Sequence, residues 1–328
     1  MTTNSLIYSN ARVKSLENTL LSQEKINRMA YSETLEDAVK VLLESNYGSG
    51  TISSAYDFEE ILHAEDKKVN AFMAESMIPN MGIETFIIKN DYHNAKAIVK
   101  AKYMHEEDFE YMLAPKGMIE INELKAKIFN DEYDSLYLPM AEALKTIDER
   151  RANGKKSPRD IDVLLDKALY KNIFEMLKST KATSIVNYWK SNVDFSNIST
   201  FIRCHNIGQD VKFFAENFIE GGEIDLEKFT SVYDNGPQVL LEKLKLTKYS
   251  NVLSEINPSD MVSFEVIWDN YLLNIFKNDR YDVISIAPLA GFYVAKMLEI
   301  KVVRMILILV KNKVDASLIT RRLREYYE

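Results

Sequence analysis

Two Asp-x-x-Asn motifs carry the side chains best suited to polar chemistry in this sequence. They pair Asp91 with Asn94 and Asp194 with Asn197, and 194 − 91 = 103 residues separate the two aspartates. An aspartate at the start of a helical pattern is first an N-cap candidate, because its carboxylate accepts a backbone N–H of the first turn. In the second motif a cation, Arg203, follows the aspartate by nine residues, which places it near the opposite helix face. We therefore expect a structural role for both motifs ahead of a direct binding role.

Nucleophiles and metal ligands do not gather in the sequence. The four histidines stand apart, and the acidic run after His105 lacks the second histidine of a zinc-binding His-Glu-x-x-His motif. Cys204 and His205 are neighbours, so on a helix they point about 100° apart and form a poor nucleophile–base pair. Gly48 and Gly50 predict a helix stop, because no Lys-Ser/Thr follows them as in a phosphate-binding loop. We expect no catalytic residue, no metal and no cofactor.

An enzyme remains an alternative hypothesis at this point. An all-α enzyme with scattered carboxylates would need a set such as Glu-x-x-His on two facing helices. We find no such set in the sequence, and its many acidic pairs are what a chain with 49 acidic residues produces by chance. The residues therefore favour a protein that is not an enzyme.

The composition is typical of a globular helical protein. Glycine (10) and proline (7) are scarce among the 328 residues, which favours few turns and long helices. The net charge of −8 argues against nucleic acid as a partner, because phosphate binding needs a basic surface. Charged residues interrupt the most apolar region, 283–310, so we expect no direct membrane insertion and no signal peptide. The protein could still sit against a membrane protein.

Helical periodicity extends over most of the chain, and strand alternation is weak. Amphipathic spacing predicts one helix over 8–30 and a second that begins at the N-cap Thr34. Further helices are expected over 57–77, 92–104, 120–132, 137–152, 160–178, 180–190, 195–205, 208–219, 225–233, 237–247, 260–277, 288–312 and 315–327. The stretch that most resembles a strand, 84–89, is short and isolated. The expected fold class is therefore all-α.

One pattern of about a hundred residues recurs three times along the chain. The glycines that follow the two Asp-x-x-Asn motifs, Gly117 and Gly222, are 222 − 117 = 105 residues apart. In the third copy Glu299 stands at the aspartate position and the segment 314–318 at the turn, only 315 − 299 = 16 residues later. Self-similarity at a fixed period is typical of stacked helical units. We expect three units, 1–117, 118–222 and 223–328.

Several short motifs, taken in order, resemble those of a known family. The motifs are Tyr8-Ser-Asn10-Ala-Arg12-Val-Lys-Ser-Leu-Glu17 at the start, Asp194-x-x-Asn197-Ile198 with Arg203 and Gly221-Gly222 in the middle, and Glu299 to Arg304 with Tyr326-Tyr327 at the end. Together they are similar to the C subunit of bacterial and archaeal V-type (A/V-type) ATPases, the counterpart of the d subunit of eukaryotic vacuolar ATPases. The resemblance covers essentially the whole chain. One position departs from the family pattern, because the asparagine usual before the late arginine is Val303 here.

The resemblance implies a non-catalytic rotor subunit. Members of this family are all-α, with three pseudo-threefold-related helical units forming a funnel with a central cavity. They lie on the cytoplasmic face of the membrane and join the central shaft subunits to the membrane proteolipid ring, with the membrane stator subunit as a further candidate partner. The candidate contact residues in this chain are Asp91, Asn94, Asp194, Asn197, Arg203 and Arg304. An unrelated soluble helical-repeat scaffold is the alternative, because repeat arrays also present concave interaction surfaces.

Overall fold

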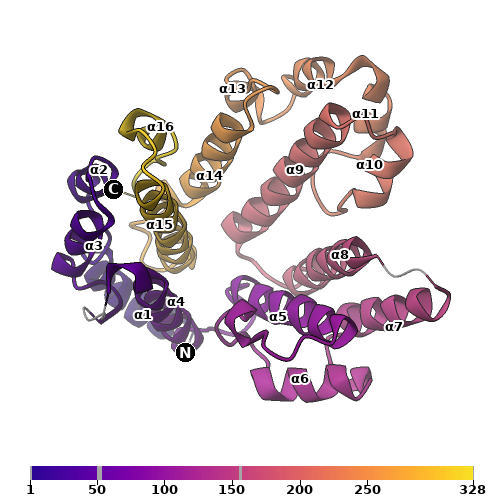
Figure 1. Ribbon diagram of the computed structural model, residues 1–328, viewed down its shortest axis with the longest axis horizontal. Helices are drawn as coiled ribbons and strands as arrows, with labels where there is room; N and C mark the ends of the chain where they lie inside the picture. The colour runs from indigo at the N-terminus through magenta and orange to yellow at the C-terminus, as the bar shows by residue number, and fades with distance from the viewer. Residues whose placement is uncertain (1, 50–53, 155–156, 328) are drawn as a thin grey trace. The chain divides into compact units, whose positions relative to one another are not determined.

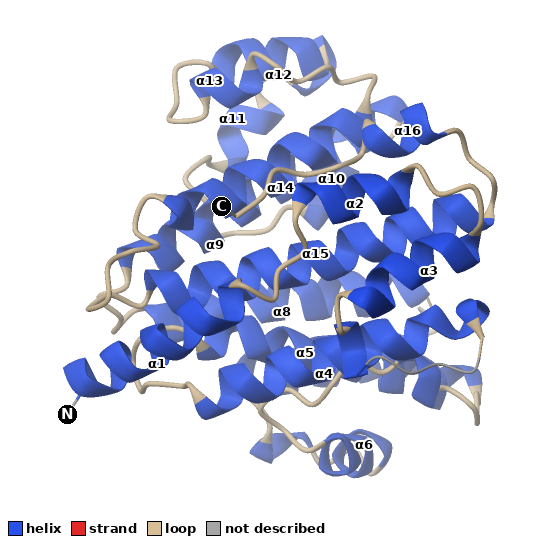
Figure 2. Ribbon diagram, turned by 90° about the vertical axis from the view of Figure 1, so that its left-hand side faces the viewer, coloured by secondary structure: helices blue, strands red, loops and turns tan. Residues whose placement is uncertain are grey.

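Helices make up the regular structure of this chain. The computed structural model describes residues 2–49, 54–154 and 157–327, and none of these residues lies in a strand (Figure 2). The all-α prediction is therefore confirmed for this part of the chain. The stretch 84–89, which resembles a strand in the sequence, forms the first turns of a long helix. No helix among the described residues is long and apolar enough to span a bilayer.

The chain divides into two compact units. Unit 1 combines both ends of the chain, Met1–Ile78 and Ser231–Glu328, and unit 2 is the middle, Pro79–Thr230. The three units that the repeat predicts, 1–117, 118–222 and 223–328, have other boundaries. They stay a prediction, as do the funnel and its central cavity.

Unit 2 contains three long helices and several shorter ones. Its α-helices are α5 (Glu84–Met104), α6 (Ile121–Phe129), α7 (Leu138–Ala152), α8 (Pro158–Leu177), α9 (Thr183–Asn206), α10 (Val211–Asn217) and α11 (Leu226–Thr230), with single 3-10 turns at η3 (Glu110–Met112) and η4 (Tyr133–Ser135). α8 packs against both α5 and α7, and α6 packs against α5 (Figure 1). Ion pairs join α5 to α8, with Lys100 Nζ 2.6 Å from Asp162 Oδ1.

Two of these long helices, α5 and α9, are buried on most of their faces. In α5 the consecutive residues Thr85, Phe86, Ile87 and Ile88 are all buried, which removes the polar stripe of an amphipathic helix. In α9 Trp189 is buried, and its ring N–H donates to the Thr85 hydroxyl of α5 at 2.8 Å. The two helices are therefore joined inside the core of unit 2.

Unit 1 is built around one long helix. Its α-helices are α1 (Thr2–Glu17), α2 (Gln23–Ala30), α3 (Leu35–Glu44), α4 (Phe58–Glu75), α12 (Pro237–Leu244), α13 (Ser250–Leu253), α14 (Met261–Lys277), α15 (Ala287–Lys311) and α16 (Ala316–Thr320), with 3-10 turns at η1 (Tyr47–Ser49), η2 (Ala55–Asp57) and η5 (Tyr233–Asn235). α15 contacts α1, α2, α3, α4, α14 and α16. Segments from both ends of the chain therefore pack on the same helix.

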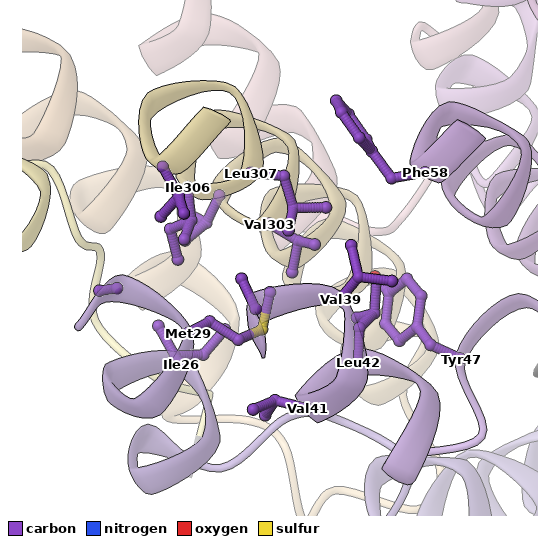
Figure 3. Close-up of a cluster of buried hydrophobic side chains, with 14 of the residues drawn as sticks. Ile26, Met29, Val39, Val41, Leu42, Tyr47, Phe58, Val303, Ile306 and Leu307 are labelled. Carbon is purple, nitrogen blue, oxygen red and sulfur yellow. The ribbon is translucent and has the colours of Figure 1, made fainter. Parts of the chain in front are cut away.

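A hydrophobic core joins α2 and α3 to α15. Ile26 and Met29 of α2 and Leu42 of α3 lie in one cluster with Val303 and Ile306 of α15 (Figure 3). Each of these five side chains is at most 3% exposed. The residue that departs from the family pattern, Val303, is therefore a core residue here.

Short polar side chains determine where the N-terminal helices begin. The sequence predicts one helix over 8–30, but the structure breaks it between α1 and α2, where Ser22 caps α2 by accepting a backbone N–H of its first turn at 3.4 Å. Thr34 caps α3 as predicted, with the corresponding bond at 3.1 Å. Of the two glycines predicted to stop α3, Gly48 has a φ of 64° in η1, and Gly50 lies outside the described residues.

Candidate functional site

The two Asp-x-x-Asn motifs lie inside helices and not at their starts. Asp91 and Asn94 are in the middle of α5, and Asp194 and Asn197 are in the middle of α9. All four side chains are buried, with at most 1% of each residue exposed. The N-cap interpretation is therefore wrong, because each carboxylate bonds to backbone that is remote in sequence and not to its own first turn.

Asp91 binds the segment that precedes α6. Its Oδ2 accepts the backbone N–H of Met118 at 3.0 Å and its Oδ1 that of Ile119 at 3.1 Å. The Tyr137 hydroxyl donates to the same carboxylate at 3.1 Å. Burial raises the pKa of Asp91 above its usual value, although these three hydrogen bonds lower it in part. The carboxylate thus provides acceptors for two backbone donors that the turn would otherwise leave unsatisfied.

Asp194 makes the same contact with the segment that precedes α11. Its Oδ1 accepts the backbone N–H of Glu223 at 2.9 Å and that of Ile224 at 3.0 Å. The donors are also one repeat apart, since 224 − 119 = 105 residues separate Ile119 from Ile224. The repeated motif therefore has a repeated geometry.

The asparagines hold an earlier part of the same segments. Asn94 donates to the carbonyl of Ala114 at 3.3 Å and accepts the N–H of that residue at 2.8 Å. Asn197 makes the same pair of bonds with Ile219, at 2.8 Å and 2.9 Å. A primary amide fits this role because it presents one donor and one acceptor side by side. Each motif therefore fixes its segment at two points.

Glycine makes room for both carboxylates. A Cβ at Gly117 would lie 2.2 Å from Asp91 Oδ1, and a Cβ at Gly222 would lie 2.1 Å from Asp194 Oδ1. Real Cβ atoms do not approach an oxygen so closely, so only glycine fits directly before the bonded N–H groups. The sequence placed these glycines in the repeat as unit boundaries, but it did not show that they face the aspartates.

We call residues 104–119 and 207–224 the clamped segments. Each starts with an exposed apolar side chain, Met104 at 61% and Ile207 at 67% exposure. The next residue in each has a positive φ, 55° at His105 and 71° at Gly208. Equivalent apolar residues are therefore presented at the ends of α5 and α9.

The two candidate arginines lie at the surface. Arg203 is exposed near the end of α9, nine residues beyond Asp194. Arg304 is on α15 in unit 1, and its Nε lies 3.2 Å and 3.1 Å from the two carboxylate oxygens of Glu59. The structure thus brings each aspartate together with its asparagine on one helix, whereas Arg203 is exposed and Arg304 pairs with Glu59.

The sequence did not reveal a buried charge cluster in unit 1. The ammonium of Lys296 lies 2.8 Å from Glu65 Oε1 and 2.7 Å from Glu299 Oε1, and all three side chains are at most 8% exposed. The same ammonium lies 4.3 Å from the centre of the Tyr47 ring. The available signal was a pair of opposite charges three residues apart within the apolar region 283–310.

The two acids of this cluster have opposite pKa shifts. Burial tends to raise the pKa of Glu65, but the charge and hydrogen bond of Lys296 and the N–H of Gly48 lower it below its usual value. Burial raises the pKa of Glu299, and Lys296 offsets this only in part. Among the described residues no three histidine, cysteine or acidic side chains are grouped so that they could hold a metal ion.

Comparison with known proteins agrees with the resemblance seen in the motifs. The profile described as ATP synthase (C/AC39) subunit matches residues 9–322. The C subunit of the A-type ATP synthase of Thermococcus kodakarensis is 25% identical over 95% of this chain and 88% of its own length. The C subunit of the V-type sodium ATPase of Enterococcus hirae is 20% identical over 97% of this chain and 98% of its own length. This chain belongs to the ATP synthase (C/AC39) subunit family.

Proposed function

We propose that this chain is a non-catalytic rotor subunit of a rotary A/V-type ATPase that joins the central shaft subunits to the membrane proteolipid ring. The family match over residues 9–322 carries the proposal. In this role the protein is peripheral on the cytoplasmic face, and ATP is hydrolysed or synthesised elsewhere in the complex. The transported ion is a proton or sodium. The ring, and not this chain, carries the residues that bind it.

The clamps support a role in transmitting torque. A coupler between two partners must not bend at its loops, and long loops are usually the parts of a protein that open most easily. In unit 2 the two clamped segments are tied to α5 and α9 by buried carboxylate and amide groups. These bonds stiffen the surface on which a partner can act.

We assign two kinds of role to the six candidate residues. Asp91, Asn94, Asp194 and Asn197 position the clamped segments, because they are buried and bond to backbone. Arg203 and Arg304 are at the surface, where a partner can reach them. The exposed Met104 and Ile207 extend the proposed contact surface of unit 2.

Reconstitution tests the proposal. The purified proteolipid ring in detergent and the purified shaft are each mixed with the full-length chain, and binding is measured by co-sedimentation and by interferometry. The proposal expects the chain to bind both and to join them in one assembly. If it binds neither, the rotor role is wrong.

Substitutions in unit 2 test the contact surface. Arg203→Ala should weaken binding to the ring or to the shaft by about tenfold or more, the effect of losing an interface arginine worth about 1.4 kcal/mol or more. Lys145→Ala is the matched control, because Lys145 is exposed in the same unit and its ion pair is with Asp134 of this chain. Equal affinities of the two variants for both partners would remove Arg203 from the contact surface.

A further inference from the structure

The long helices of all three copies end in the same way. A residue with positive φ follows the acid by the same distance in each, since 105 − 91, 208 − 194 and 313 − 299 all equal 14. In each copy the N–H of the next residue bonds to the carbonyl five residues earlier, at 3.0, 2.9 and 3.0 Å. This is the hydrogen-bond pattern of a Schellman helix end. Glu299 therefore occupies the position of Asp91 and Asp194 in α15.

Glu299 binds a backbone N–H, as the two aspartates do, but from the other end of the chain. Its Oε2 accepts the N–H of Leu21 at 2.5 Å. The segment after α15 that the repeat predicts at this place, 314–318, instead starts α16, whose N-cap is Asp315. The third acid is thus satisfied by residues that lie 299 − 21 = 278 positions away in sequence.

The bound segment has the same form in all three copies. Ile119, Ile224 and Leu21 each lie two residues before the first residue of a short helix, which is α6, α11 or α2. Three residues into each helix stands a side chain that is at most 3% exposed. These residues are Leu124, Phe229 and Ile26. The N-terminal segment, which we define as residues 18–45, therefore occupies in the third copy the place that the loop after the long helix occupies in the first two.

We call the three contacts of Asp91, Asp194 and Glu299 with backbone N–H groups the joints. In the third joint a charge cluster stands in place of the asparagine. The position three residues after Glu299 is the apolar Val302, which is buried and cannot hold a backbone amide. Instead, Lys296 bridges Glu299 to Glu65 of α4, and the second oxygen of Glu65 accepts the N–H of Gly48 at 3.1 Å. The cluster ties the turns at both ends of α2–α3 to α4 and α15.

A pocket opens beside this joint. Its volume is about 340 Å³, and it is lined by Leu21, Ser22 and Ile26 of the N-terminal segment and by Glu299 and Val302 of α15, together with residues of α14 and the C-terminal segment. Deeper in the same segment, α2 and α3 share a hydrophobic core with α15. The polar cluster and this core therefore hold the segment together.

We propose that the N-terminal segment is a latch that completes the third helical unit, with Glu299 in the role that Asp91 and Asp194 have in the other two. The first two joints are closed by loops that directly follow their helices in sequence. The third joint is closed by a segment that does not follow α15 in sequence, so its opening exposes the core that α2 and α3 share with α15 and leaves the contacts of α15 with α4 and α14 in place. The inference concerns this chain alone and does not depend on its partners.

Hydrogen exchange of the full-length chain, followed by mass spectrometry, tests the latch. Glu299→Ala leaves Lys296 paired with Glu65 but removes the acceptor of the Leu21 N–H, so it should speed exchange in residues 18–45 by about tenfold or more. Glu299→Gln keeps one acceptor for the Leu21 N–H and should give an intermediate increase. Exchange in unit 2 should not change in either variant.

Asp194→Ala is the matched control, because it removes the equivalent acid in unit 2 and should speed exchange only around 218–225. Two results would overturn the proposal. One is exchange in residues 18–45 of Glu299→Ala that is no faster than in the wild type. The other is an equal increase in α2, α14 and α15, which would show that Glu299 supports the whole unit and not a latch. If Glu299→Ala fails to fold, the same comparison is made with Glu299→Gln.

Discussion

Replacing Gly222 by alanine tests the carboxylate clamp most directly. The new Cβ would lie 2.1 Å from Asp194 Oδ1 and 3.2 Å from Val193 Cγ1. The backbone of Gly222 does not have the positive φ that makes alanine strained, so the effect comes from the clash. The carboxylate has to retreat from the two N–H groups of Glu223 and Ile224.

The size of the effect follows from the bonds that are lost. A hydrogen bond to a charged group contributes about 1.5–3 kcal/mol, and a buried donor left without an acceptor adds a penalty of similar size. Partial relaxation of the loop recovers some of this, so we expect Gly222→Ala to lower the free energy of unfolding of unit 2 by roughly 2–4 kcal/mol. That is a large part of the roughly 5–15 kcal/mol typical of a folded domain.

Tryptophan fluorescence during urea unfolding measures this change in unit 2 alone. The chain has two tryptophans, Trp189 in α9 and Trp268 in α14. In a Trp268→Phe background, Trp189 reports on the helix that carries Asp194. Gly208→Ala is the matched control in the same clamped segment, because Gly208 has a φ of 71° and an added Cβ would meet no atom within 4 Å.

A double-mutant cycle separates the clash from other effects. The control should show only the left-handed backbone penalty, about 1–2 kcal/mol. In an Asp194→Ala background the oxygen that Gly222→Ala displaces is absent, so the second substitution should cost about 2 kcal/mol less than it does alone. The clamp argument fails if the two substitutions are additive within about 0.5 kcal/mol, or if Gly222→Ala costs no more than Gly208→Ala.

Two further predictions concern burial and close packing. Because burial raises the pKa of Asp91, its stabilising contribution is full below the unfolded-state pKa of about 4 and is lost as pH rises through the higher folded-state pKa. The free energy of unfolding of Asp91→Asn should therefore fall less between pH 4 and neutrality than that of the wild type, and equal slopes would contradict the shift. A Cβ at Gly291 would lie 2.0 Å from Tyr327 Oη and 2.8 Å from Phe276 Cβ. Gly291→Ala should thus cost about 1–3 kcal/mol by overpacking and speed hydrogen exchange at 321–327, while Gly154→Ala, with no atom within 4 Å, should leave that segment unchanged.

The sequence predicted the fold class, and it showed the two Asp-x-x-Asn motifs at a fixed spacing, because both depend on local signals. Three of these signals can be recognised without any knowledge of tertiary contacts. They are the scarcity of glycine and proline, the cap at Thr34 and the 103-residue spacing of the aspartates. Helix starts failed where helices are buried. α5 begins at Glu84, but its first turns carry no polar stripe, so the visible pattern began at residue 92. In α9 the sequence predicted two helices, 180–190 and 195–205, where the structure has one, Thr183–Asn206.

The site was predicted in its residues and not in its geometry. An aspartate that caps a helix and one that holds a distant loop look alike in sequence, since both are acids in front of a helical pattern. What separates them here is the glycine 26 or 28 residues later, at 117 − 91 and 222 − 194, which has to face the carboxylate. The Lys296 cluster joins residues 65 and 296, and no local pattern reports a contact over that distance.

The three acids bind backbone in two ways. In α5 and α9 a short aspartate reaches the loop that follows its own helix, and an asparagine adds a second hold on the same loop. In α15 the acid is a glutamate, one methylene longer, that binds Leu21, and the second hold is an ion pair to α4. An ion pair can join two helices that are distant in sequence, whereas the aspartate–asparagine clamp binds one continuous segment. Val302, which stands where the other two copies have asparagine, and the buried Lys296 therefore belong together: without an amide to bind a loop, the joint between Leu21 and α15 is held by charge.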